Sequence, residues 1–214
     1  MIREDLYELP LEKGMGFLVV GVICPEEIEM LGGEKGYSHL LNVYREVSNT
    51  PFKKNQEFSQ LSELMPPFVL ARKPKSRGKQ KWRKIGSRSL EEYRLPEFYS
   101  CYSDFYKKHE EEEWWDIISR IYSNEKRSSE YNKVSHLMPW LHINFSGLAT
   151  IITMYFIKNN GKEILDYYSL RSKETSSDDE FIEEVYYWIL NLPDYSKVPQ
   201  EIRWVENKNK IDIQ

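Results

Sequence analysis

The sequence predicts a mixed α+β protein, with a small antiparallel, curled sheet or partial barrel in the N-terminal half and a mainly helical C-terminal half. Short runs of β-branched and aromatic residues, separated by glycine and proline, fill the first hundred residues. Apolar residues then recur at helical spacing. Hydrophobic residues make up 40% of the 214-residue chain, which is enough to form a core.

The N-terminal region begins with two runs that predict a β-hairpin. Residues 6–11 precede the turn-rich stretch Glu-Lys-Gly-Met-Gly, and the β-branched run 17–24 stops at Pro25. Residues 39–47 alternate between apolar and polar side chains, which predicts a third strand.

The next stretch predicts one short helix and two further strands. Residues 59–65 suit a short helix closed by Pro66 and Pro67. Residues 68–71 and 81–85 suit two strands joined by a basic loop. Five short strands without a long helix predict the curled sheet.

Three helices are expected in the C-terminal half. The first covers residues 110–122, with acidic residues at its start. The second begins near Ser146, turns Leu148, Ile151, Ile152 and Tyr155 toward the core, and ends at the stretch Asn-Asn-Gly161. The third begins at Ser177 or Asp178, places Phe181, Val185, Trp188 and Leu192 on one face, and ends at Pro193.

The change of pattern divides the chain into a β-rich region, residues 1–95, and a helical region, residues 96–214, which either share one core or form two. The first region has 16 Lys and Arg against 13 Asp and Glu, a charge of +3; the second has 14 against 21, a charge of −7. Such an asymmetry is typical of a protein that binds a basic partner, or of one whose acidic residues simply form a solvated surface.

Several classes of protein lack support in the sequence. Cys24 and Cys101 form no metal or redox motif, and His136 and His142 have no zinc-site spacing. No leader-like segment opens the chain, and the longest apolar runs fall short of the roughly 18 residues that cross a bilayer. We therefore expect a cytoplasmic protein without metal, cofactor or membrane partner.

Enzyme activity is not expected, because the chain contains no nucleophile elbow or comparable motif. A hydrolase remains an alternative if the fold brings Ser135 or Cys101 close to a histidine and a carboxylate.

The basic segment 72–84 contains eight cations and one tryptophan, a composition that could follow a phosphate backbone. The candidate nucleic-acid-binding residues are Arg77, Lys79, Lys81, Trp82 and Arg83. The other interpretation is an exposed hairpin loop that runs into an amphipathic edge strand, where cations prevent unwanted strand pairing.

An acidic run followed by two tryptophans is the candidate site for binding a partner. It consists of Glu110, Glu111, Glu112, Glu113, Trp114 and Trp115. Carboxylates are also common at an ordinary helix start. Adjacent helical tryptophans point about 100° apart, so one of them could lie at the surface and anchor a partner protein.

Two parts of the N-terminal half resemble the immunity protein 26 family of bacterial polymorphic-toxin immunity proteins. Residues 9–23, Leu-Pro-Leu-Glu-Lys-Gly-Met-Gly-Phe-Leu-Val-Val-Gly-Val-Ile, resemble its opening hairpin. Pro-Phe-Val-Leu at 67–70 and Lys-Trp-Arg-Lys-Ile-Gly at 81–86 resemble later strands. The resemblance implies a small β-rich fold and a cytoplasmic protein that neutralises a cognate protein toxin by stoichiometric binding.

Overall fold

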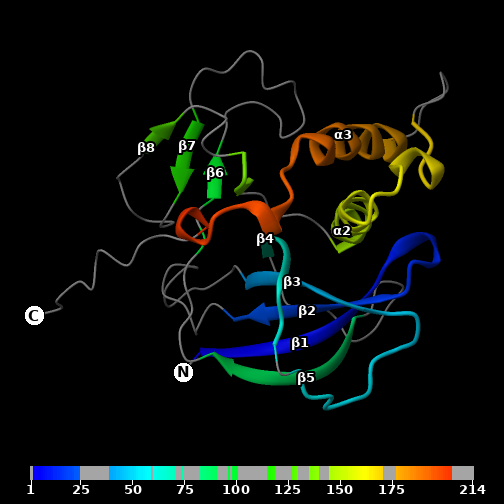
Figure 1. Ribbon diagram of the computed structural model, residues 1–214, viewed down its shortest axis with the longest axis vertical. Helices are drawn as coiled ribbons and strands as arrows, with labels where there is room; N and C mark the ends of the chain where they lie inside the picture. Colours follow the sequence, from blue (N-terminus) through cyan, green and yellow to red (C-terminus); the bar gives the residue numbers. More distant parts are fainter. Residues whose placement is uncertain are drawn as a thin grey trace, which may run out of the picture.

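The computed structural model describes most of the N-terminal sheet and the C-terminal helices (Figure 1). The described residues are 2–24, 39–58, 60–70, 74, 82–90, 96, 98–100, 115–118, 127–129, 135–139, 145–170 and 177–203.

A five-stranded antiparallel, curled sheet forms the N-terminal half, in the order β4-β3-β2-β1-β5. Its strands are β1 (Ile2–Pro10), β2 (Phe17–Ile23), β3 (His39–Ser48), β4 (Glu63–Leu70) and β5 (Arg83–Leu90). The predicted hairpin is confirmed, because β1 pairs with β2 from Glu4 opposite Ile23 to Pro10 opposite Phe17. The predicted third strand is β3, and β5 lies at a sheet edge.

Strand β4 corrects the helix expected over residues 59–65. Glu63, Leu64 and Met65 are extended, and the strand continues through Pro66 and Pro67. Proline is tolerated here because β4 lies at the sheet edge. The pairing also shifts at this point, from Leu41 opposite Phe68 to Val43 opposite Met65, so the prolines occupy an irregular part of the ladder.

A smaller four-stranded sheet precedes the helices, in the order β8-β7-β6-β9. Its strands are β6 (Phe98–Ser100), β7 (Trp115–Ile118), β8 (Arg127–Ser129) and β9 (Met138–Pro139). The helix expected over residues 110–122 is therefore wrong at Trp115–Ile118. Tryptophan and isoleucine also favour strands, and here they pair with β6 on one side and β8 on the other.

The two later helices are confirmed as α2 (Phe145–Asn159) and α3 (Ser177–Asn191). The four core positions expected in α2 are all buried. The amide of Lys162 donates to the Ile157 carbonyl past Gly161, whose φ of 67° suits a helix end that glycine closes. Short 3₁₀ turns are η1 (Glu12–Gly14), η6 (Ile164–Asp166), η7 (Tyr195–Lys197) and η8 (Gln200–Ile202).

Lys158 joins the ends of the two helices. Its Nζ donates to the carbonyl oxygens of Ile189, Leu190 and Leu192, at 2.7, 3.0 and 2.6 Å. The last carbonyls of a helix lack a full set of intrahelical donors, although the Ile189 carbonyl also accepts from the Leu192 amide at 3.3 Å. A cation there interacts favourably with the helix dipole. Burial lowers the pKa of the Lys158 ammonium, although Asp194 acts in the opposite direction.

One core connects the sheet with the helices. Its buried side chains include Leu9 and Val20 from the sheet, Ile152 from α2 and Trp188 from α3. Figure 1 shows α2 and α3 on the same side of the sheet. A smaller cluster contains Leu6, Val19, Tyr44, Phe52 and Ile85. Among the described residues, no helix is long and apolar enough to cross a membrane.

Candidate functional site

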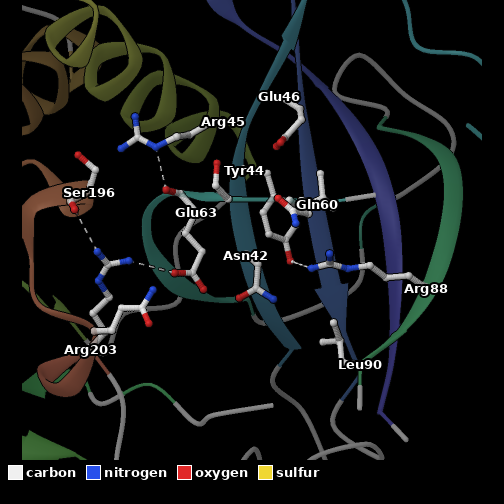
Figure 2. Close-up of a pocket in the computed structure, with 13 residues that line it drawn as sticks. Asn42, Tyr44, Arg45, Glu46, Gln60, Glu63, Arg88, Leu90, Ser196 and Arg203 are labelled. Carbon is white, nitrogen blue, oxygen red and sulfur yellow. Dashed lines mark hydrogen bonds and ion pairs between the residues drawn. The ribbon is translucent and has the colours of Figure 1, made fainter. Parts of the chain in front are cut away.

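A polar hollow of about 980 Å³ lies where β3, β4 and β5 meet the C-terminal turns η7 and η8. Its charged lining residues are Arg45, Glu46, Glu63, Arg88 and Arg203. Figure 2 shows them converging from opposite sides, with Arg88 on β5 and Arg203 in the C-terminal segment. The volume is typical of a site for a small ligand or an inserted side chain.

Glu4 holds one wall of the hollow from inside the sheet. It is fully buried, and its Oε1 accepts hydrogen bonds from Asn42 Nδ2 at 2.6 Å and from the Tyr44 hydroxyl at 2.5 Å. Its Oε2 accepts from Arg88 Nε at 2.6 Å. The register of the sheet produces this cluster. Glu4 on β1 lies opposite Arg88 on β5, and Gly21 on β2 lies opposite Asn42 on β3.

Gly21 makes room for the Glu4 carboxylate. A Cβ atom at this position would overlap Glu4 Oε1 and Cδ. The glycine therefore lets a carboxylate lie across β2 and reach Asn42 and Tyr44 on β3.

Arg88 is fixed in a defined orientation at the edge of the hollow. Its Nη2 donates to the Tyr44 hydroxyl at 2.7 Å, and its guanidinium lies 4.9 Å from the centre of the Tyr44 ring. Burial alone would lower the pKa of Arg88, but the Glu4 carboxylate and Tyr44 raise it above its usual value. The guanidinium therefore stays charged.

Arg45 and Arg203 form the opposite wall. Arg45 Nε donates to the Glu63 carbonyl at 3.1 Å, and its Nη2 lies 3.5 Å from Asp194 Oδ1. Arg203 donates to the Val198 carbonyl from Nε at 2.8 Å and from Nη2 at 2.6 Å. Its Nη1 lies 3.6 Å from Glu63 Oε2, the ion pair drawn in Figure 2.

The two lining carboxyl groups both have raised pKa values. Burial raises the pKa of Glu63, and the nearby Arg203 only partly offsets it. Burial also raises the pKa of Glu46, although backbone amides of Glu46 and Ser62 act in the opposite direction. Glu46 Oε2 is buried and accepts no hydrogen bond.

Glu46→Gln is expected to raise the free energy of unfolding at pH 7 by about 1 kcal/mol, because it removes a charge that is costly to bury unpaired. The folded-state pKa of Glu46 lies above the unfolded value, so ionisation disfavours the fold as the pH rises through these values. The advantage of glutamine should therefore disappear below about pH 4. Urea unfolding at several pH values measures the difference in the free energy of unfolding between Glu46→Gln and the native chain. The control is Glu57→Gln, at an exposed position. A pH-independent difference between Glu46→Gln and the native chain would contradict this expectation.

The acidic candidate site lies mostly outside the described residues. This applies to Glu110, Glu111, Glu112, Glu113 and Trp114. The remaining member, Trp115, begins strand β7 rather than continuing a helix. The spacing of about 100° between helical tryptophans therefore does not apply to it.

The basic candidate residues have different positions. Arg77, Lys79 and Lys81 lie outside the described residues. Trp82 is 3% exposed and belongs to the main core, which removes its ring from base stacking. Arg83 Nη2 donates to Glu8 Oε2 at 2.7 Å and also to the Phe52 carbonyl. These two contacts favour the interpretation as an amphipathic edge strand.

Neither residue named for a possible hydrolase, Ser135 or Cys101, belongs to the described lining of the hollow. The ring Nε2 of His136 lies 2.8 Å from the Ile202 carbonyl oxygen, and neighbouring Ser135 is not part of the hollow's lining. Cys101 lies outside the described residues. No group of three or more histidine, cysteine or acidic residues in the described part could hold a metal ion.

Comparisons with models of known protein families, with curated proteins and with solved structures found no match.

Proposed function

We propose that this chain is a binding protein of the immunity class, which neutralises a bacterial protein toxin by stoichiometric association in the cytoplasm. The observation that supports binding is the prearranged charge in the hollow. Arg88 is held by Glu4 at 2.6 Å, and Arg45 and Arg203 lie 3.5 and 3.6 Å from Asp194 and Glu63. Each of the three also has a second hydrogen-bonding or ring contact. Side chains that are ordered in advance lose less entropy when a partner arrives.

The same groups argue for association rather than turnover. Within the part of the chain that the structure describes, the lining includes no histidine or cysteine, and each arginine already donates to a protein oxygen. Glu46 Oε2 accepts no hydrogen bond and so has a free lone pair, but no histidine or cysteine of the described lining lies beside it as a proton-transfer partner or nucleophile. The hollow instead offers fixed donors and acceptors, which is what recognition of a polar segment requires.

The proposal that the partner is a toxin rests on the resemblance of residues 9–23, 67–70 and 81–86 to the immunity family. Residues 110–115 remain a second candidate contact, through which an acidic segment could accelerate association with a basic toxin. The nucleic-acid alternative is weakened by the burial of Trp82.

The test begins with a tagged full-length chain recovered from its source cells, with bound proteins and nucleic acid assayed together. We expect one protein in a ratio near unity, which arrests growth when produced alone and loses this effect when the chain is co-produced. A retained protein without toxicity, or one whose toxicity persists, would overturn the proposal. Nuclease-sensitive retention of nucleic acid would assign the function to the basic segment.

A further inference from the structure

Two large apolar side chains lie next to each other on the solvent face of α3. Tyr187 is 52% exposed and Leu190 is 47% exposed, and a spacing of three residues places them on the same face of the helix. The opposite face, with Val185 and Trp188, is buried in the main core. Figure 1 shows α3 farther from the main sheet than α2. The helix therefore keeps an apolar pair in contact with solvent.

Tyr187 is supported by its neighbour along the chain. The Tyr186 ring packs partly against the main core, and the two rings meet edge to face with their centroids 5.3 Å apart. An aromatic ring that is positioned in advance loses little entropy on binding, and tyrosine is among the residues that most often anchor protein interfaces. Single exposed hydrophobic residues are ordinary on a surface, whereas an adjacent pair on one helix face favours a contact.

The charged residues of α3 are all acidic, and the helix contains no lysine or arginine. They are Asp178, Asp179, Glu180, Glu183 and Glu184. The helix dipole favours carboxylates in the first turn, but Glu183 lies beyond it. Because Glu183 is four residues before Tyr187, it lies on the same face. At the other end of the helix, the carbonyl oxygens already accept from the Lys158 ammonium. The face is therefore acidic toward its N-terminal end and apolar toward its C-terminal end.

We infer that this outer α3 face, formed by Glu183, Tyr187 and Leu190, is a docking surface for the partner protein, and that the partner presents a basic amphipathic segment to it. An apolar side chain of that segment packs on Tyr187 and Leu190, and a lysine or arginine pairs with Glu183. The inference rests on the proposed function, in which the partner is a protein. It adds a surface to the hollow, whose described lining contains no residue of α3.

Other occupants suit the outer α3 face less well. A nucleic acid or an anionic membrane surface would be repelled by the acidic residues. A second copy of the chain would bring an equally acidic helix, with no cation in α3 to pair with Glu183. Only a basic amphipathic segment gains both apolar contact and charge complementarity.

The test titrates the isotope-labelled full-length chain with three short synthetic peptides, followed by amide chemical shifts. The first has leucine and lysine at amphipathic helical spacing. The second replaces every lysine by glutamate, and the third replaces every leucine by serine. We expect only the leucine–lysine peptide to shift amides of α3.

Two matched pairs of variants locate the binding. Leu190→Gln should lose about tenfold in affinity for the leucine–lysine peptide, whereas Leu165→Gln, at a leucine that is 48% exposed in η6, should keep it. Glu183→Lys should also lose about tenfold, whereas Glu57→Lys, at another exposed glutamate, should not. Leu190 belongs to the exposed face of the helix, so we expect its replacement to leave the urea unfolding midpoint nearly unchanged.

Four results would overturn the inference. The first two are equal binding of either control peptide and equal loss of affinity in Leu165→Gln and Leu190→Gln. The third is the absence of shifts in α3 up to roughly 5 mM peptide, above the millimolar Kd expected of a short segment. The fourth is a concentration-dependent shift of the α3 amides without peptide, which would assign the face to self-association.

The docking surface and the immunity function can fail separately. A toxin recovered with the chain should bind Leu190→Gln about tenfold more weakly than the native chain and Leu165→Gln equally well. A neutralised toxin that binds Leu190→Gln as tightly as the native chain would remove the outer α3 face and leave the immunity function. Specific binding of the leucine–lysine peptide at α3 without any neutralised toxin has the opposite meaning.

Discussion

Glu4→Ala is expected to lower the free energy of unfolding by about 3 kcal/mol, the largest effect of any single substitution around the hollow. The change leaves the guanidinium of Arg88 without its carboxylate, and it removes the acceptor of Asn42 and Tyr44. Arg88 is 27% exposed, so water reaches only part of it. Urea denaturation monitored by tryptophan fluorescence measures the loss.

Glu8→Ala provides a matched comparison on the same strand. Glu8 is also buried and also pairs with an arginine, but that arginine, Arg83, is 44% exposed and can recover hydration. We expect this substitution to cost about half as much, because solvent screens the cation that is left behind. Glu4→Gln, which keeps the shape, should fall between the native chain and Glu4→Ala. Equal costs for the two alanine substitutions would show that burial of the arginine does not determine the effect.

Local patterns were sufficient for most of the individual elements. The β-branched run of β2 and the apolar faces of α2 and α3 each identify their structure, because one face of the element must be buried. The two wrong helix predictions, over residues 59–65 and 110–122, concern stretches whose conformation depends on their position in a sheet. Pro66 and Pro67 stop a helix or a central strand, yet an edge strand accommodates them. Residues Trp115–Ile118 suit a helix or a strand, and they form a strand because they pair with β6 and β8.

The hollow could not be predicted in the same way. Its inner wall joins Glu4, Asn42, Tyr44 and Arg88, which are up to 84 positions apart. Glu4 lies between Arg3 and Asp5, a charged stretch that suggests a solvent-facing strand end, and only the order β3-β2-β1-β5 brings its partners to it. The unbonded Oε2 of Glu46 could not be predicted either, because it depends on which backbone amides and arginines the fold places beside it.

Gly21→Ala is expected to cost about 2 kcal/mol, the second largest effect, because the added methyl group would overlap the Glu4 carboxylate. The carboxylate cannot simply move aside, since Asn42, Tyr44 and Arg88 hold it in place. Gly86→Ala is the matched control in the same sheet, because a Cβ atom there meets nothing within 4 Å. That control should change the free energy of unfolding by less than about 0.5 kcal/mol.

A double-mutant cycle separates the overlap from the ordinary behaviour of glycine in a strand. If Gly21 exists to make room for Glu4, then Gly21→Ala should cost little once Glu4 has been replaced by alanine, and the coupling free energy should approach about 2 kcal/mol. Additive effects would mean that the two positions act independently. In that event the glycine would serve the backbone of β2 alone, and the Glu4 carboxylate would not depend on it to reach Asn42 and Tyr44.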